Sequence, residues 1–229
     1  IYTGNISNSN ENGLCQIQKF NESDQTGNIK DLIQIFQLET ILIFNAILLK
    51  RRVLVYHNNL HDLLKYMKAI SSLVRRRDPN FYLHPWVEDN SNELLEFKSK
   101  NWYVVGTIQK SITTKTELFD LSVNIPNAEI QIMPNAKESF TMTKTHKEIA
   151  LSMVQLSQDT NVSDYDIECI LSDKVDDIIT QLKSLGTVDV NNGDNEKFIT
   201  LEHLRSKKFN ANIEMFLFNL ALAENIIML

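Results

Sequence analysis

A long apolar stretch that leads directly into a short β-branched run constrains the fold of this chain more than any other feature. Residues 29–49 are apolar on almost every side at helical spacing. A run of about 20 such residues is long for a strand, so the pattern predicts a buried helix. Residues 52–57, which contain Val-Leu-Val-Tyr, then predict a short buried strand.

The following segments predict a strand-and-helix alternation. Apolar residues recur at helical spacing from Leu60 to Val74, Asn58 or Asn59 can cap this helix, and Pro79 stops it. Further strands are predicted at 81–83, 102–108, 117–123 and 129–133, and a short helix at 92–100. Strands that alternate with helices indicate a mixed or parallel sheet with helices on its faces.

After Pro134 the strand signal fades and amphipathic patterns take over. Helices are predicted at 136–158, 164–185, 197–208 and 211–228. We therefore expect the α/β class, with a mixed sheet flanked by helices and an all-helical C-terminal third. The expected divisions are a polar linker or arm at 1–28, an α/β module at 29–134 and a helical extension at 135–229. Because the chain begins at Ile1 rather than Met, we also expect that an N-terminal stretch is missing.

The overall composition excludes several classes of protein. Six glycines and four prolines are too few for collagen-like or turn-dense architectures. A formal charge of -6 argues against a general nucleic-acid binder, which needs a net basic surface. Cys15 and Cys169 make neither a disulfide framework nor a zinc site, so a reducing cytosol fits best. We see no signal peptide and no transmembrane run.

The charges are unevenly distributed along the chain. Residues 50–77 hold eight Lys and Arg against one acid, whereas residues 159–177 hold seven acids against one Lys. Such segments either form solvated faces, with cations favoured at the C-terminal end of a helix, or dock a partner of opposite charge. For the basic segment, that partner is an acidic protein or an anionic membrane surface. The candidate partner-binding residues are Arg75, Arg76, Arg77, Asp173, Asp176 and Asp177.

The sequence offers no catalytic or metal-binding motif. His57 and His61 are four residues apart, but Asn58 stands where the zincin helix needs Glu. His146 lies on an expected helix without partners at metal-ligand spacing, so we interpret it as part of a solvated face. The glycine-rich phosphate loops and the G-x-S-x-G motif are absent. We therefore expect no catalytic residue, no metal and no cofactor.

An ordered series of segments resembles the central module of the DENN family. In that module a leucine-rich helix ends in a basic pair and runs into a buried strand, as residues 38–57 do here. The other segments that match its helices and strands in order are 60–74, 102–106, 117–124, 133–148 and 212–225. The resemblance covers nearly everything from Ile29 to Leu229.

The resemblance implies a protein of two lobes. A longin-like lobe comes first, and an α/β module with a helical downstream extension follows; this chain matches the second lobe and its extension, without the first. DENN proteins act largely as guanine-nucleotide exchange factors for Rab GTPases, whose switch regions they hold between the two lobes. The expected function is therefore regulation of Rab GTPases, as an exchange factor or a Rab-binding module, in late endosomal and secretory trafficking.

The resemblance also leaves a non-catalytic alternative open. One DENN subfamily is associated with the Commander endosomal retrieval assembly through its coiled-coil subunits, so this chain is either a Rab regulator or an adaptor. The expected partners are a Rab GTPase, those coiled-coil subunits and the longin-like lobe, with no nucleic acid and at most peripheral contact with a membrane. The expected location is the cytoplasm and the late endosome surface. Because the matched positions are mainly core positions, no GTPase-contacting residue is carried over.

Overall fold

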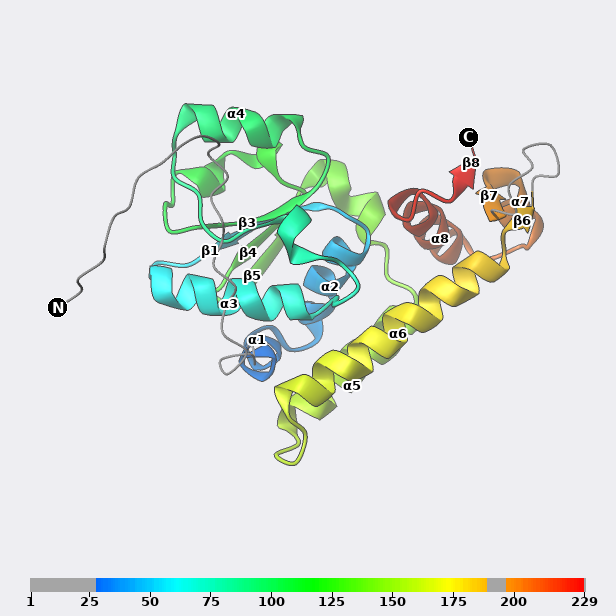
Figure 1. Ribbon diagram of the computed structural model, residues 1–229, viewed down its shortest axis with the longest axis horizontal. Coiled ribbons are helices and arrows are strands. Elements are labelled where there is room, and N and C mark those ends of the chain that lie inside the picture. The colour runs from blue at the N-terminus through cyan, green and yellow to red at the C-terminus, as the bar shows by residue number, and fades with distance from the viewer. Residues whose placement is uncertain (1–27, 189–196, 229) are drawn as a thin grey trace, which may run out of the picture.

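The computed structural model of the protein describes residues 28–188 and 197–228. The expected polar arm falls almost entirely on residues 1–27, which, like Cys15 within them, lie outside the described residues. Figure 1 shows an α/β body, a pair of long helices beside it and a smaller unit at the C-terminal end. The predicted α/β class, with a mixed sheet flanked by helices, is confirmed.

The long apolar stretch forms the buried helix that the sequence predicts, but the helix is broken. It consists of α1 (Ile29–Phe36), the 3-10 turn η2 (Gln37–Glu39) and α2 (Thr40–Leu48). The break lies at Gln37, whose φ of 49° is left-handed rather than helical. Every residue of α2 except Leu42 is buried, as expected for a helix that is apolar all round.

By length and hydropathy alone, Ile29–Leu48 passes the test for a membrane-crossing helix. However, 61% of its apolar window is buried inside the fold, which is typical of the core helix of a globular domain.

The main sheet has the strand order β2-β3-β1-β4-β5. Its strands are β1 (Arg52–Tyr56), β2 (Leu83–His84), β3 (Tyr103–Thr107), β4 (Leu121–Asn124) and β5 (Glu129–Ile132). β1 pairs in parallel with β3 and β4, β2 is parallel to β3, and β5 is antiparallel to β4. The candidate strand at 81–83 begins only at Leu83, because Asp78 caps a 3-10 turn, η3 (Pro79–Phe81), in front of it.

Helices cover the two faces of this sheet. α3 (Leu60–Ser72) lies on the side of α1 and α2, and α4 (Ser91–Ser99) lies on the opposite side (Figure 1). Because strand side chains alternate, Val53 and Val55 of β1 join the cluster around α2 and α3, while Leu54 packs with Phe97 of α4. The link from β3 to β4 passes through two 3-10 turns, η4 (Ile112–Thr114) and η5 (Thr116–Leu118).

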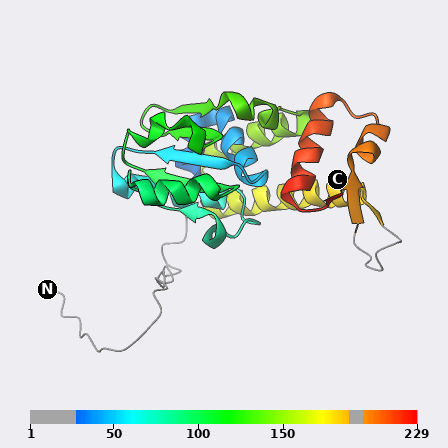
Figure 2. The same ribbon diagram turned by 90° about the horizontal axis from the view of Figure 1, so that it is seen from above.

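The chain then forms an antiparallel pair of long helices, α5 (Lys144–Gln158) and α6 (Asp164–Ser184). The helix predicted from residue 136 starts later, because Pro134–Phe140 forms a 3-10 segment, η6, and Thr143 caps α5. Figure 2 shows α6 running along the side of the molecule from the α/β body towards the C-terminal unit. One hydrophobic cluster includes Leu32 in α1, Met153 in α5, Leu171 in α6 and Leu220, so the extension packs onto the body.

The prediction of an all-helical C-terminal third needs a correction. Residues 197–208 begin as a strand, β7 (Lys197–Thr200), and only then form a helix, α7 (Leu201–Ser206), because Thr200 is its N-cap. The last predicted helix ends at Ala223, as α8 (Ala211–Ala223), where Asn225 adopts a left-handed φ of 56°. With β6 (Thr187–Val188) and β8 (Ile227–Met228), β7 forms a small three-stranded sheet.

Candidate partner-binding site

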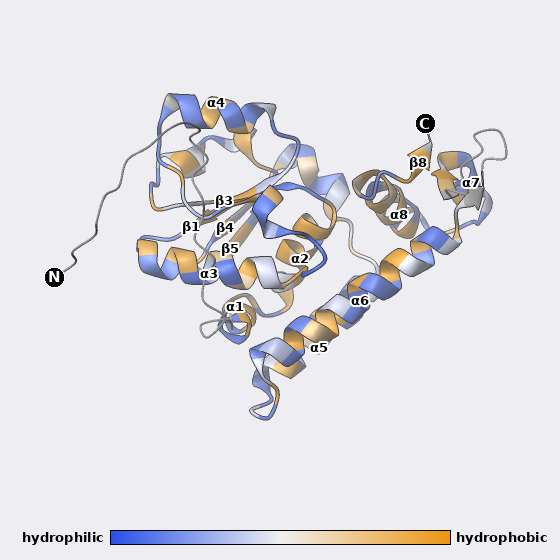
Figure 3. Cartoon of the chain, viewed as in Figure 1, coloured by the Kyte–Doolittle hydropathy of each residue, from blue (hydrophilic) through white to orange (hydrophobic). Residues whose placement is uncertain are grey.

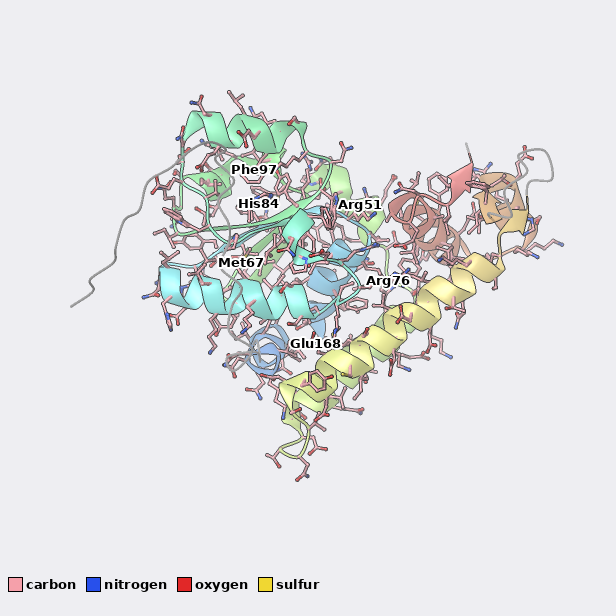
Figure 4. The ribbon with its side chains drawn as sticks, in the orientation of Figure 1. Arg51, Met67, Arg76, His84, Phe97 and Glu168 are labelled. Atoms are coloured by element: carbon pink, nitrogen blue, oxygen red, sulfur yellow. The ribbon has the colours of Figure 1, made fainter. Side chains whose placement is uncertain are left out.

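The two charged segments that the sequence singles out face each other in the folded chain. Arg75, Arg76 and Arg77 follow the end of α3, and α6 passes beside them (Figure 4). Arg76 donates from Nη1 to Asp176 Oδ1 at 3.0 Å. Two of the predicted partner-binding residues, Arg76 and Asp176, therefore bind each other within the same chain.

Arg77 has an internal role. Its Nη2 donates to the backbone oxygen of Leu48 at 2.6 Å and to Glu224 Oε1 at 2.5 Å, and the side chains of Arg77 and Glu224 are each only 8% exposed. The Nε of Arg77 has no hydrogen-bond partner among the described residues. This arginine joins the end of α2 to the end of α8, so its side chain is poorly placed to meet another protein.

Arg75 is the most accessible of the three arginines. Its Nε lies 3.7 Å from Glu168 Oε1, and its guanidinium lies over the ring of Tyr165, 5.9 Å from the centroid. Hydrogen bonding to Tyr165, together with the charge of Glu168, raises the pKa of Arg75. Because the Arg75 side chain is 52% exposed, it can contact a partner without leaving α6.

The predicted acidic residues lie on the outer face of α6. The buried positions of this helix are Ile167, Leu171, Val175, Ile179 and Leu182, which face the hydrophobic cluster. Asp173, Asp176 and Asp177 lie between them and are exposed. Asp173 and Asp177 form no ion pair with any described residue, so a partner-binding role for these two stays a prediction. Figure 3 shows the resulting alternation of hydrophilic and hydrophobic residues along α6.

Sequence reasoning missed the polar contacts that join the C-terminal unit to the α/β body. We call Arg51, Arg76, Arg77, Asn219 and Glu224 the arginine seam. Arg51 donates from Nη2 to Asn219 Oδ1 at 2.8 Å, and burial lowers the pKa of this guanidinium. The sequence did contain a signal for these contacts. Asn219 is a polar residue within the apolar run of α8, and Glu224 directly follows that run.

The interpretation of His146 as part of a solvated face is wrong. His146 is 2% exposed, and its ring packs edge-on against Phe216 at 4.5 Å between centroids. Its Nδ1 accepts the backbone N–H of Thr143 at 3.1 Å and therefore carries no proton, which leaves the proton on Nε2, 3.3 Å from Asn45 Oδ1. Desolvation lowers the pKa of His146 to about 4. His146 thus replaces the usual Glu of a capping box.

The structure brings no metal site together within residues 28–188 and 197–228. There is no group of three or more His, Cys, Asp and Glu side chains that could hold an ion there. His57 accepts the backbone N–H of Asn59 on Nδ1 at 2.9 Å, so this ring takes part in the turn before α3.

Comparisons with known proteins give the family of this chain. A family model described as "Stabilization of polarity axis" matches residues 27–134. DENN domain-containing protein 10 of Danio rerio is 36% identical over 229 residues, which cover 99% of this chain and 64% of that protein. The chain belongs to the DENN family. The human protein of the same name is 32% identical over 230 residues, and that of Dictyostelium discoideum is 31% identical over 198 residues.

This DENN chain spans a little under two thirds of the length of its fish and human relatives, 64% in each. The aligned region covers 99% of the chain, so it spans α5 to α8 as well as the sheet.

Proposed function

We propose that the protein is a DENN-family regulator of Rab GTPases, acting as a guanine-nucleotide exchange factor or as a Rab-binding module in late endosomal and secretory trafficking. The observation that carries this proposal is the similarity to DENN domain-containing protein 10 along almost the whole chain. The protein acts from the cytoplasm at the late endosome surface, where it contacts the membrane peripherally.

Exchange requires no covalent chemistry from the protein. A factor that binds the nucleotide-free GTPase more tightly than the loaded form shifts the equilibrium towards nucleotide release. The Rab lies between this lobe and a longin-like lobe, and both lobes contribute to the preference.

The decisive experiment is nucleotide release from a panel of Rab GTPases loaded with a fluorescent GDP analogue. Full-length protein is added to each Rab in turn, and EDTA provides the reference for complete release. Faster release from one or a few Rabs supports an exchange factor. Binding without acceleration supports a Rab-binding module, and neither binding nor acceleration with any Rab refutes both forms of the proposal.

The alternative function is that of a non-catalytic adaptor of the Commander endosomal retrieval assembly. The observation in its favour is the outer face of α6, where Asp173 and Asp177 are exposed and form no ion pair within the described chain. Purified coiled-coil subunits are captured on full-length protein and on Asp173→Lys/Asp177→Lys. Glu148→Lys, which makes one such charge reversal instead of two, is the control on an exposed site of α5. Capture that is lost only in the α6 variant supports the adaptor, and equal capture by all three proteins removes α6 from consideration.

A further inference from the structure

We propose that Tyr165 is a phosphorylation site and that Arg75 is the built-in partner of its phosphate. Tyr165 is 55% exposed. The other tyrosines among the described residues are buried or half-buried: Tyr56, Tyr66, Tyr82 and Tyr103. A kinase that acts on the folded chain therefore meets Tyr165 more readily than any of those four.

The position of Tyr165 in the fold favours access. It is the second residue of α6, directly after the connection between α5 and α6. Figure 1 shows this connection projecting at one end of the molecule, away from the sheet. Asp164 and Asp166 flank the tyrosine, and Glu168 follows one turn later. An acidic flank of this kind suits a tyrosine kinase whose substrate groove is basic.

One cation, Arg75, already lies beside the tyrosine. The guanidinium of Arg75 already lies over the Tyr165 ring, and its only ion pair in the described chain is the 3.7 Å contact with Glu168. A phosphate on the phenolic oxygen carries about -1.5 to -2 charges at neutral pH and three acceptor oxygens. Arg75 can turn from Glu168 to this phosphate and form charge-assisted hydrogen bonds with it. The acids at 164 and 166 are already engaged, with the backbone N–H of Lys30 and with Ser163.

The reaction is an ordinary phosphoryl transfer from ATP by a tyrosine kinase. The phenolic oxygen of Tyr165 forms a bond to the γ-phosphorus, the bond from that phosphorus to the β,γ-bridging oxygen breaks, and ADP leaves. The phenolic proton passes to the base of the kinase. The product holds Arg75 against α6, so the most accessible arginine of the predicted docking triplet is withdrawn from partners.

The test uses full-length protein, Mg-ATP and a recombinant tyrosine kinase that prefers acidic residues around its target tyrosine. The phosphorylated positions are then identified by peptide mass spectrometry. We expect one dominant phosphate at Tyr165, its loss in Tyr165→Phe, and no change in Tyr66→Phe. Phosphorylation of Tyr165 only after the protein has been denatured would overturn the proposal, because the helix then protects the residue.

The role of Arg75 has a separate readout in phosphorus NMR. The second pKa of the phosphate, ordinarily about 6, should be higher by about half a unit in Arg75→Gln than in the wild type, because a nearby cation favours the dianion. Arg76→Gln is the matched control, since that arginine pairs with Asp176 and Glu224 and not with Glu168. An identical phosphate titration in the wild type and in Arg75→Gln would refute the pairing. Both tests are independent of whether the protein binds a Rab.

Discussion

Removing the carboxylate of Glu224 should destabilise the protein far more than removing any exposed acid of α6. In Glu224→Ala the guanidinium of Arg77 stays buried with only the backbone oxygen of Leu48 as a partner. Breaking a buried ion pair from one side costs about 3–5 kcal/mol, because the remaining charge has lost its partner but not its burial. Native domains have only about 5–15 kcal/mol in total, so this single change should remove a large part of the stability.

Matched variants separate the burial effect from the loss of charge. Asp176→Ala removes the closer of the two acids that pair with Arg76 and leaves the 3.9 Å contact between Arg76 Nε and Glu224 Oε2. Because the side chains of Arg76 and Asp176 are 35% and 56% exposed, the change should cost less than about 1 kcal/mol. The double variant Arg77→Met/Glu224→Leu removes both charges and fills the space, so it should recover most of the loss seen in Glu224→Ala.

Urea unfolding followed by two probes measures these costs. Far-UV circular dichroism reports all helices, whereas the fluorescence of Trp86 and Trp102 reports the α/β body, since both tryptophans lie there. If the arginine seam fastens α8 to the body, helix content in Glu224→Ala is lost at lower urea than tryptophan fluorescence changes. The reasoning would be refuted if Glu224→Ala lowered the free energy of unfolding by less than about 1 kcal/mol. It would also be refuted if the double variant lost as much stability as Arg77→Met and Glu224→Leu lose together when measured separately.

Three further changes test other parts of the fold. The free energy of unfolding should fall by up to about 3 kcal/mol as the pH drops from 6.5 to 4. The reason is that His146 takes up a proton near pH 6.5 in the unfolded chain, whereas in the folded chain it stays neutral down to its pKa of about 4. His146→Gln keeps an acceptor for the Thr143 N–H and should flatten this part of the pH profile of urea midpoints. Gly106→Ala should lower the free energy of unfolding by about 1–3 kcal/mol, because a Cβ there would overlap the carbonyl oxygen of Pro85. An unchanged urea midpoint would contradict this close approach. Ser163→Ala should cost about 1 kcal/mol, since the hydroxyl of this residue accepts the Asp166 N–H at the start of α6, whereas Ser184→Ala at the other end of the helix should be nearly neutral.

The sequence was sufficient to predict the strands and helices whose formation depends on neighbouring residues alone. β1 follows from a β-branched run, and α3 follows from helical spacing and an Asn whose side chain accepts an N–H of the first turn. The break at Gln37 could not be predicted, because a left-handed φ at a residue other than Gly carries no local mark. The small strands at 187–188, 197–200 and 227–228 are too short to show a clear alternating pattern, and they form only by pairing with one another.

The lack of partners at metal-ligand spacing led to the interpretation of His146 as part of a solvated helix face, whereas the residue is buried. The residue sits at the third position of α5, where a Glu or Gln would have marked a capping box. A histidine can serve there only if its Nδ1 stays unprotonated, which burial against Phe216 ensures by lowering the pKa of the ring. The burial depends on α8, which arrives about 70 residues later in the chain, so no local pattern around His146 contained it.

The arginine triplet shows why charge patterns locate a surface more easily than they identify what the surface binds. Arg76 and Asp176 are 100 residues apart in sequence, and Arg77 and Glu224 are 147 residues apart. The polarised charges of the two segments favour their attraction, but that attraction is satisfied first within the chain because the tethered partner is always present at a high effective concentration. A substitution of Arg77 therefore lowers the stability of the fold, so a loss of binding in such a variant cannot be assigned to a lost contact with the partner. Tests of a partner must use side chains that the fold leaves accessible. Of the six predicted partner-binding residues, Arg75, Asp173 and Asp177 are exposed and lie outside the Arg76–Asp176 and Arg77–Glu224 pairs.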